Sequence, residues 1–265
     1  MNKKLGEYLF VSQAGADLVN GFAKITACVY RPWVLDSRVQ PLKDAFHGAS
    51  GYSFPSGHTT VATNLFLGAV LRGKFSKGLN IALLACLFLI CFSRNYVGVH
   101  TVLDVICGFI LTAIVLLIFS KLFDKLEEKP NLDLVISAIG ILISILIVIY
   151  ALTKSYPMDY DAAGKLLVDP AKLMLDTFRN AGLAIATFIS WPIERRFIKF
   201  SSEGSLEDKA LRFVCGFVAL EFIINVIMPL FGDTPLEAFL EFFVLIIFVM
   251  LIYPAIIKFF QNRKN

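Results

Sequence analysis

Three short stretches of this sequence carry residue types that bind phosphoryl groups and move protons. Lysine and arginine supply fixed positive charge, and histidine beside a carboxylate supplies a nucleophile or a base. In chain order the stretches contain Lys24 and Arg31-Pro32; Pro55-Ser56-Gly57-His58; and Ser93-Arg94, His100 and Asp104. Their spacing indicates how each stretch is built.

The first two stretches predict an anion site at the ends of helices. Lys24 and Arg31 are two helical turns apart and so share one helix face, which Pro32 ends. Ser56 is a natural N-cap, and the free N–H groups at the start of the following helix attract anions. Gly57 allows a ligand to approach the backbone closely.

The third stretch predicts a polarised histidine. Asp104 follows His100 by one helical turn, a spacing that places the carboxylate beside the imidazole on a helix. The carboxylate can keep one ring nitrogen protonated and leave the other as a nucleophile or base. Arg94 adds a third cation, and such cations bind phosphoryl oxygens more strongly as charge develops in a transition state. Together the three stretches predict a phosphate site.

Composition places this site in a membrane protein. Of 265 residues, 57% are apolar and 17% are charged. This chain is too apolar for one water-soluble core. We therefore expect an all-α, polytopic transmembrane bundle and disfavour a disordered chain, a disulfide scaffold or a nucleic-acid binder. The five cysteines are interpreted as small hydrophobic residues. Eight membrane helices are predicted, over residues 6–30, 58–71, 79–92, 102–123, 132–152, 181–200, 211–231 and 236–260.

Basic residues predict the orientation of this bundle. Sixteen of the 25 Lys and Arg residues fall on one side of the predicted topology. The positive-inside rule places that side, and with it both termini, in the cytoplasm. Residues 31–58, 93–101 and 153–179 then lie outside. All three stretches that carry the candidate site residues are predicted on this extracytoplasmic side. The protein is expected in the cell membrane.

The motifs resemble those of the type 2 phosphatidic acid phosphatase and vanadium haloperoxidase superfamily, in its membrane lipid phosphatase branch. The family signature is Lys, six residues, Arg-Pro; then Pro-Ser-Gly-His; then Ser-Arg, five residues, His, three residues, Asp. Every position matches in order and spacing, over 81 positions from Lys24 to Asp104. The vanadate-dependent haloperoxidases share this site but are usually soluble, so they fit the chain poorly.

The resemblance implies a role for each matched residue. His100 attacks phosphorus and forms a phosphohistidine, Asp104 orients the imidazole, and His58 acts as acid and then as base. The phosphate ligands implied are Lys24, Arg31, Ser56, Gly57 and Arg94. The resemblance implies no metal and no cofactor.

The family comparison also predicts an unusual domain organisation. Residues 1–152 form the phosphatase core, 153–180 an external loop, and 181–265 three additional transmembrane helices. Membrane members have two helices before the Arg-Pro motif, and here one precedes it. We therefore expect the chain to lack the first family helix, and the helix at 6–30 to show an apolar stripe without a partner.

The expected function is hydrolysis of a phosphomonoester or diphosphate by a membrane-embedded, metal-independent phosphatase, a phosphoric ester hydrolase of lipid metabolism. For a diphosphate it would be an acid anhydride hydrolase. Phosphatidate, phosphatidylglycerophosphate and isoprenoid diphosphates are candidate substrates, and membrane lipids are the other expected contacts. No nucleic acid and no obligate protein partner are implied. Two alternatives are a phosphatase for a soluble substrate such as a sugar phosphate, and a non-catalytic membrane protein for binding or transport.

Overall fold

The protein is a bundle of long helices in a computed structural model that describes residues 3–49 and 51–264, without the side chains of residues 47 and 264. The described residues form no β-strand, only one isolated bridge between Tyr160 and Leu166, so the all-α prediction is confirmed. The elements are α1 (Lys3–Ala27), α2 (Pro32–Leu35), α3 (Lys43–His47), α4 (Gly57–Ala62), η1 (Thr63–Leu67), α5 (Gly68–Arg72), α6 (Lys77–Tyr96), α7 (Val102–Lys125), α8 (Leu132–Thr153), α9 (Pro170–Ile193), η2 (Glu194–Ile198), α10 (Leu206–Phe222), η3 (Ile223–Ile227), η4 (Met228–Leu230), α11 (Pro235–Ile247), η5 (Phe248–Ile252) and α12 (Tyr253–Lys264).

Five helices in the described chain are long and apolar enough to cross a membrane: Lys77–Tyr96, Val102–Lys125, Leu132–Thr153, Leu206–Leu230 and Pro235–Arg263. The predicted count of eight membrane helices is therefore not confirmed. The helical run from α4 to α5 is shorter than a bilayer-spanning helix usually is. The other two long helices, α1 and α9, carry several charged residues along their lengths.

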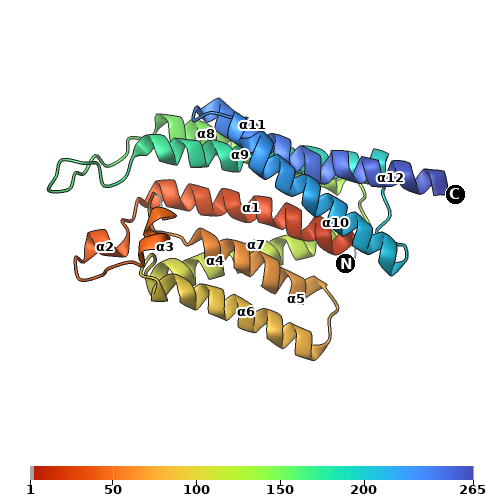
Figure 1. The fold of residues 1–265 in the computed structure, drawn as a ribbon, viewed down its shortest axis with the longest axis horizontal. Coiled ribbons are helices and arrows are strands. Elements are labelled where there is room, and N and C mark those ends of the chain that lie inside the picture. The colour runs from red at the N-terminus through yellow and green to blue at the C-terminus, as the bar shows by residue number, and fades with distance from the viewer. Residues whose placement is uncertain (1–2, 50, 265) are drawn as a thin grey trace.

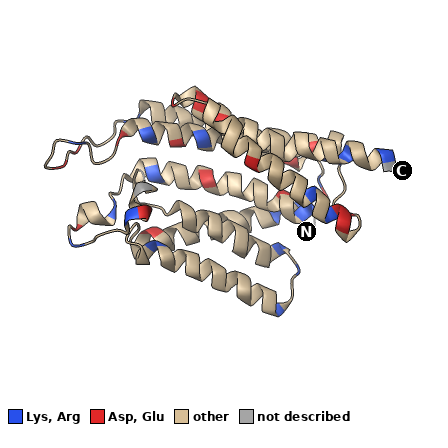
Figure 2. Ribbon diagram, in the orientation of Figure 1, with Lys and Arg blue, Asp and Glu red and all other residues tan. Residues whose placement is uncertain are grey.

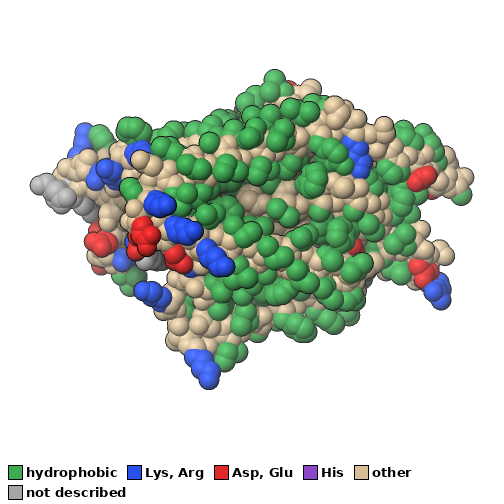
Figure 3. Space-filling model, turned by 180° about the vertical axis from the view of Figure 1, so that it is seen from behind, with side chains coloured by type: hydrophobic (Ala, Val, Ile, Leu, Met, Phe, Trp, Pro, Cys, Tyr) green, Lys and Arg blue, Asp and Glu red, His purple; other side chains and the backbone are tan. Residues whose placement is uncertain are grey.

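The long helices run side by side, and α1 begins at the same end of the molecule at which α12 ends (Figure 1). The short helices α2 and α3 and the loop before α9 lie at the opposite end. Charged residues gather mainly toward the two ends of the bundle (Figure 2). The face seen from behind is covered largely by hydrophobic side chains (Figure 3), as expected for a surface that contacts lipid.

Helix α9 packs along α1, and it also packs on α8 and α11. Trp191 of α9 is fully buried and stacks on Phe123 of α7, with ring centroids 5.2 Å apart, and Tyr8 of α1 contacts the same phenylalanine edge-on. The expectation that the first helix would leave its apolar stripe without a partner is wrong, because α9 covers it.

Helix α9 also begins earlier than the predicted start at Ala181. Its first residue is Pro170, because Asp169 caps the helix by accepting a hydrogen bond of 2.9 Å from the Ala171 N–H. Proline suits the first turn of a helix, where its missing N–H would have no partner within the helix. The extra turns carry polar side chains of α9 toward the end of the bundle that holds α2 and α3.

Ion pairs connect α1, α8 and η2, the segment that continues α9, at the end of the bundle where α1 begins. The fully buried carboxylate of Asp133 pairs with Arg195 at 3.2 Å and with Arg196 at 2.5 Å. Arg195 also reaches Glu7 at 3.2 Å, and the indole of Trp191 donates to the same Glu7 carboxylate. The network therefore ties the C-terminal helices to the rest of the bundle.

Replacing Asp133 with alanine should destabilise the fold, because it removes the acceptor that two guanidinium groups share. We expect a loss of about 1–3 kcal/mol, measured by thermal unfolding in detergent micelles. As a matched control, Asp36→Asn removes an exposed carboxylate that pairs with Arg38 and should leave the melting temperature unchanged. If the two variants had the same melting temperature, Asp133 would not stabilise the contact between these helices.

Candidate active site

The three motif stretches meet at the end of the bundle that holds α2 and α3. The first stretch lies at the end of α1 and just beyond it, the second at the start of α4, and the third runs from the end of α6 to the start of α7. The prediction that Lys24 and Arg31 share one helix face is wrong, because α1 ends at Ala27 and Arg31 has an extended backbone. A backbone hydrogen bond of 3.1 Å from the Ser56 N–H to the Asp104 carbonyl joins the second stretch to the third. The structure thus brings together residues that lie far apart in the sequence.

His100 is the best-defined group of the site. Its side chain is buried, and the Nδ1 atom faces Ser53 Oγ at 3.3 Å and Asp104 Oδ2 at 3.7 Å. Ser53 donates to the same Asp104 oxygen at 2.6 Å. The direct distance from the imidazole to the carboxylate is too long for a hydrogen bond, so the serine hydroxyl connects the two groups.

This arrangement determines which ring nitrogen of His100 carries the proton. Because Ser53 uses its proton on Asp104, its lone pair accepts the proton of Nδ1. The Nε2 atom then carries the lone pair, and it lies 3.1 Å from Arg31 NH1. This nitrogen therefore faces a cation.

Asp104 is held by the start of α7. Its Oδ2 accepts from the Thr101 N–H at 2.6 Å, and the Thr101 hydroxyl accepts from the Asp104 N–H at 3.2 Å. The two bonds together form a capping box. The carboxylate is thus fixed both by its own helix and by Ser53, which explains how one side chain can cap a helix and orient His100.

Two cations are anchored by backbone carbonyls. Arg31 is buried and donates through Nε to Gly51 O at 3.2 Å and through NH1 to Val99 O at 2.9 Å. Lys24 donates to the carbonyls of Tyr52 and Pro55, both at 3.0 Å. These bonds tie the cations to the loops that carry the second and third motifs.

The start of α4 has the predicted cap. Ser56 Oγ accepts from the Thr59 N–H at 3.4 Å. A Cβ added at Gly57 would meet no atom within 4 Å, so the space above this backbone is open. By contrast, a Cβ at Gly108 of α7 would lie 3.0 Å from Ser56 O, so glycine there allows the motif loop to sit against α7.

The remaining two predicted residues lie at the edge of the site. His58 is exposed, and it feels the charges of Arg94 and Arg31. The Arg94 guanidinium bonds to the hydroxyl of its neighbour Ser93 at 3.0 and 3.1 Å. Within the described part of the chain, neither of these two side chains hydrogen-bonds to the His100 ring. The side chain of the third histidine, His47, lies outside the described residues.

Sequence reasoning missed Ser53 and Asn95. Asn95 donates to the His100 carbonyl at 2.9 Å and so fixes the backbone of the residue expected to be the nucleophile. Ser53 stands shortly before Ser56, outside the family signature, and its only signal was a small polar residue in a loop that leads to a motif. Its partners come from the start of α7, so no local spacing rule identifies them.

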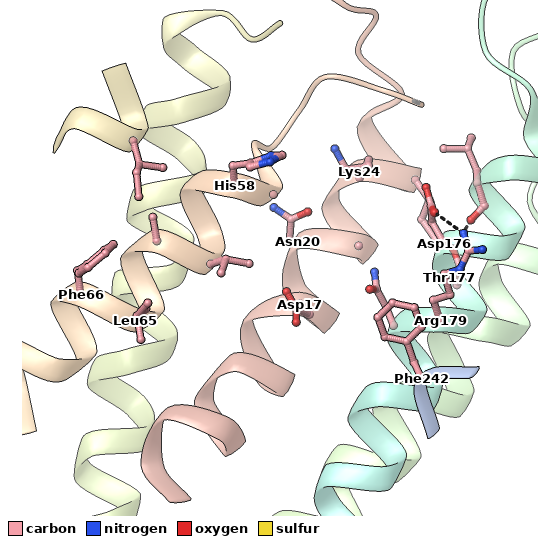
Figure 4. A pocket seen from close by; sticks show the side chains of 18 residues that line it. Asp17, Asn20, Lys24, His58, Leu65, Phe66, Asp176, Thr177, Arg179 and Phe242 are labelled. Carbon is pink, nitrogen blue, oxygen red and sulfur yellow. Dashed lines mark hydrogen bonds and ion pairs between the residues drawn. The ribbon is translucent and has the colours of Figure 1, made fainter. Parts of the chain in front are cut away.

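A lateral cleft opens from this site (Figure 4). It has a volume of about 610 Å³, and α1 lines its middle, with α4 and η1 on one side and α9 and α11 on the other. Lys24, Gly57 and His58 line one part of it, and Leu65 and Phe66 line its apolar part. The cleft thus joins the motif residues to an apolar space between helices.

The electrostatics of the site keep His100 neutral. Burial lowers the pKa of His100 to about 4, and the charges of Arg31 and Lys24 add to this effect, although the Asp104 carboxylate opposes it. The folded-state pKa therefore lies below the ordinary value of about 6.5. The imidazole gains its proton only as the pH falls through about 4, so it stays available as a nucleophile near neutral pH.

This charge state can be measured directly, because the chain has three histidines. In ¹⁵N-histidine-labelled protein, with His100→Asn used to assign the resonance, the ring of His100 should remain neutral down to about pH 5, above the lowered pKa. Titration of that ring near its ordinary pKa would contradict the buried environment described above.

Two family profiles match this sequence. The sequence profile of the PAP2 superfamily matches residues 6–128, and the profile described as PAP2 superfamily phosphatase, transmembrane extension, matches residues 178–264. No solved structure matches the chain.

Two curated relatives match a shorter region. Sphingosine-1-phosphate phosphatase 1 from Mus musculus is 37% identical over 84 residues, which is 30% of this chain and 20% of that protein. The protein of the same name from Rattus norvegicus is 36% identical over 84 residues, with the same shares of the two chains. The match spans about a fifth of the length of these relatives.

The two profiles lie on either side of the loop before α9 and together cover most of the chain. The first of them contains every motif residue of the site, from Lys24 to Asp104. The chain therefore belongs to the PAP2 superfamily.

Proposed function

We propose that this chain is an integral-membrane phosphatase that hydrolyses a phosphate ester on a lipid through a phosphohistidine on His100. The observation that carries the proposal is the orientation of His100. Its Nδ1 atom is held by Ser53 and Asp104, and its Nε2 atom faces the cation Arg31. A binding protein needs the cations but has no use for a nucleophile oriented in this way.

In the first half of the reaction, His100 Nε2 attacks phosphorus and the bond from phosphorus to the ester oxygen breaks. His58, at the edge of the site, gives its proton to the departing alkoxide. The Asp104 carboxylate stabilises the positive charge that the imidazole of His100 gains. The lipid alcohol then leaves.

Fixed groups of the protein stabilise the negative charge of the phosphoryl group. Three cations neutralise its oxygens, and the open N–H groups at the start of α4 add hydrogen bonds. These phosphate ligands are Lys24, Arg31, Arg94, Ser56 and Gly57. The cations fill the role that Mg²⁺ has in many other phosphoryl-transfer enzymes, so we expect activity without a divalent metal.

In the second half, water attacks phosphorus and the bond from phosphorus to His100 Nε2 breaks. His58, now neutral, takes a proton from that water, so it returns to its starting state. Inorganic phosphate leaves, and both histidines are ready for the next substrate.

The apolar part of the cleft supports a lipid substrate. A hydrocarbon chain can lie against Leu65 and Phe66 while its phosphate reaches Lys24 and His58. The curated relatives are named for a lipid phosphate. Phosphatidate, phosphatidylglycerophosphate and isoprenoid diphosphates remain candidates under this proposal, the last as an anhydride rather than an ester.

We place the site on the extracytoplasmic face of the cell membrane, with both termini in the cytoplasm. The distribution of Lys and Arg supports this orientation. Residues 1–152 then carry the chemistry, the connection between α8 and α9 lies outside, and the helices from α9 onward contact lipid and the phosphatase core.

The proposal is tested by phosphate release from purified protein in detergent, with a panel of lipid phosphates, lipid diphosphates and sugar phosphates. Lipid phosphates should be hydrolysed in the presence of EDTA, and His100→Ala should reduce turnover to background. Activity that survives His100→Ala, or that EDTA abolishes, would refute the mechanism. Hydrolysis of sugar phosphates alone would refute the lipid substrate.

Ser53 should act as a positioning residue. Ser53→Ala removes the hydroxyl that links His100 to Asp104, and we expect kcat to fall by about 10- to 100-fold with little change in KM. Ser53→Thr keeps the hydroxyl and should restore most of the activity.

Ser144→Ala is the matched control for this serine, because Ser144 is equally buried but bonds only to Gly140 O within its own helix. It should leave kcat unchanged. A loss of activity equal in Ser53→Ala and Ser144→Ala, or one explained by a lower melting temperature, would show that Ser53 has no positioning role.

A further inference from the structure

Helix α10 is the least buried of the five candidate membrane spans. With its continuations η3 and η4 it covers Leu206–Leu230, and none of these residues is buried against the rest of the described chain. The helix lies on the outside of the bundle (Figure 1). Its outer surface therefore contacts either lipid or a second protein chain.

One face of α10 packs on α12. The hydroxyl of Tyr253, the first residue of α12, donates to the Arg212 carbonyl. A Cβ added at Gly216 would lie 2.9 Å from the ring of the same tyrosine. Arg212 and Gly216 are one helical turn apart, so together they mark the face of α10 that points toward α12. Residues half a turn away from this face point outward.

The outward face of α10 carries a stripe with the spacing of a helix–helix seam. Its residues follow one another by alternating steps of three and four positions, the repeat found in pairs of helices that wrap around each other. The seam consists of Leu211, Val214, Val218, Glu221 and Asn225. All of them are exposed. By helix periodicity the stripe lies opposite the face that packs on α12.

Lipid is a poor cover for this seam, because two of its side chains are polar. At a rise of about 1.5 Å per residue, Glu221 lies about 14 Å from the nearer end of the span, near the middle of a bilayer core of about 30 Å. Asn225 Nδ2 donates to its carboxyl group at 2.9 Å and to its carbonyl at 2.8 Å. In the described chain these are the only hydrogen bonds of the two side chains. By contrast, Glu241 of α11 pairs with Arg179 at 3.2 Å.

A second copy of the chain supplies the missing partners. Two copies in one membrane have the same orientation, so their α10 helices run parallel, and a two-fold axis along the membrane normal places each seam residue beside its equivalent. The Asn225 amide both donates and accepts, and an oxygen of a carboxyl group accepts in either protonation state. The polar pair is therefore complementary to itself. A polar residue in an apolar seam also fixes the register of two helices.

We propose that this seam is the interface of a parallel homodimer, in which Glu221 and Asn225 of one copy hydrogen-bond to the same two residues of the other within the membrane. The seam lies in the part of the chain that matches the transmembrane extension, so the proposal gives that extension a role in assembly. None of the seam residues lines the cleft beside the candidate active site. The inference is therefore independent of the proposed function.

Disulfide cross-linking of the full chain in phosphatidylcholine vesicles tests the geometry. The background carries Cys86→Ser and Cys215→Ser, which remove the two exposed cysteines. Val218→Cys should then form a cross-linked dimer on mild oxidation. Phe213→Cys is the matched control, because Phe213 is on the same helix and more exposed than Val218, at 73% against 61%, but lies outside the seam. It should cross-link only weakly.

The affinity of the two copies tests the role of the polar pair. Single-molecule photobleaching of labelled protein, over a range of protein-to-lipid ratios, gives the dissociation constant of the dimer in the membrane. Replacing Glu221 and Asn225 together by leucine should raise this constant by about tenfold, although it makes the helix more apolar. Glu221→Gln keeps an acceptor and should retain the dimer. Phe213→Leu, outside the seam, should leave the constant unchanged.

Three results would overturn the proposed interface. The first is a wild-type protein that stays monomeric at every protein-to-lipid ratio, which would mean that lipid covers the seam. The second is equal cross-linking of Val218→Cys and Phe213→Cys. The third is a dissociation constant that the double leucine variant leaves unchanged. Neither measurement uses phosphate release, so a failure of the interface and a failure of the phosphatase proposal are distinguishable.

Discussion

The site depends on cations that use backbone carbonyls as their anchors. Lys24 and Arg31 donate to four carbonyls, at distances of 2.9–3.2 Å; the acceptors belong to Gly51, Tyr52, Pro55 and Val99. A carbonyl oxygen fixes a cation without cancelling its charge, whereas a carboxylate would neutralise it. The positive charge therefore remains available to a phosphate, and the loops that carry the other motifs are placed by the same bonds.

The hydrogen bonds from Lys24 couple the packing of α1 to the position of His100. The loop that accepts from Lys24 also carries Ser53, and it is bonded through Ser56 to the start of α7. A displacement of Lys24 would thus move the serine that orients His100. The charge network around Asp133 and the packing of α9 on α1 fix the helix from which Lys24 projects. The C-terminal helices are part of the framework of the site as well as a wall of its cleft.

Only part of the site follows from sequence spacing. The cap at Ser56 is a local feature, and helix geometry predicts it. Lys24 and Arg31 do not share a helix, because α1 ends at Ala27. His100 lies before the Thr101 cap of α7, so helix spacing does not explain how these residues meet. The structure places these residues together at one end of the bundle, as the resemblance to the family implies. Their catalytic roles rest on chemistry that the geometry supports but that only activity measurements test.

Ser53 was missed because its contact lies between distant elements. It hydrogen-bonds to Asp104 of α7, far along the chain, so no periodicity connects the two residues. Asn95 differs, because it donates to the His100 carbonyl only five residues away. The prediction of an apolar stripe without a partner on α1 was wrong for a reason similar to that for Ser53. Helix α9, which follows the external loop in the sequence, packs on α1. The predicted helix count exceeds the five candidate spans of the described chain for two reasons. Helices α1 and α9 are long enough to span a bilayer but carry several charged residues, and the run from α4 to α5 is too short.

The most direct test of His100 as the nucleophile is the detection of phosphate on its ring. His58→Ala should slow the second half of the reaction, so brief exposure to a ³²P-labelled lipid phosphate followed by denaturation in alkaline detergent should trap a labelled protein. Mass spectrometry should locate the phosphate on His100, and the label should be absent from the variant that combines His58→Ala with His100→Ala. Label on another residue, or turnover without any covalent intermediate, would contradict the assignment.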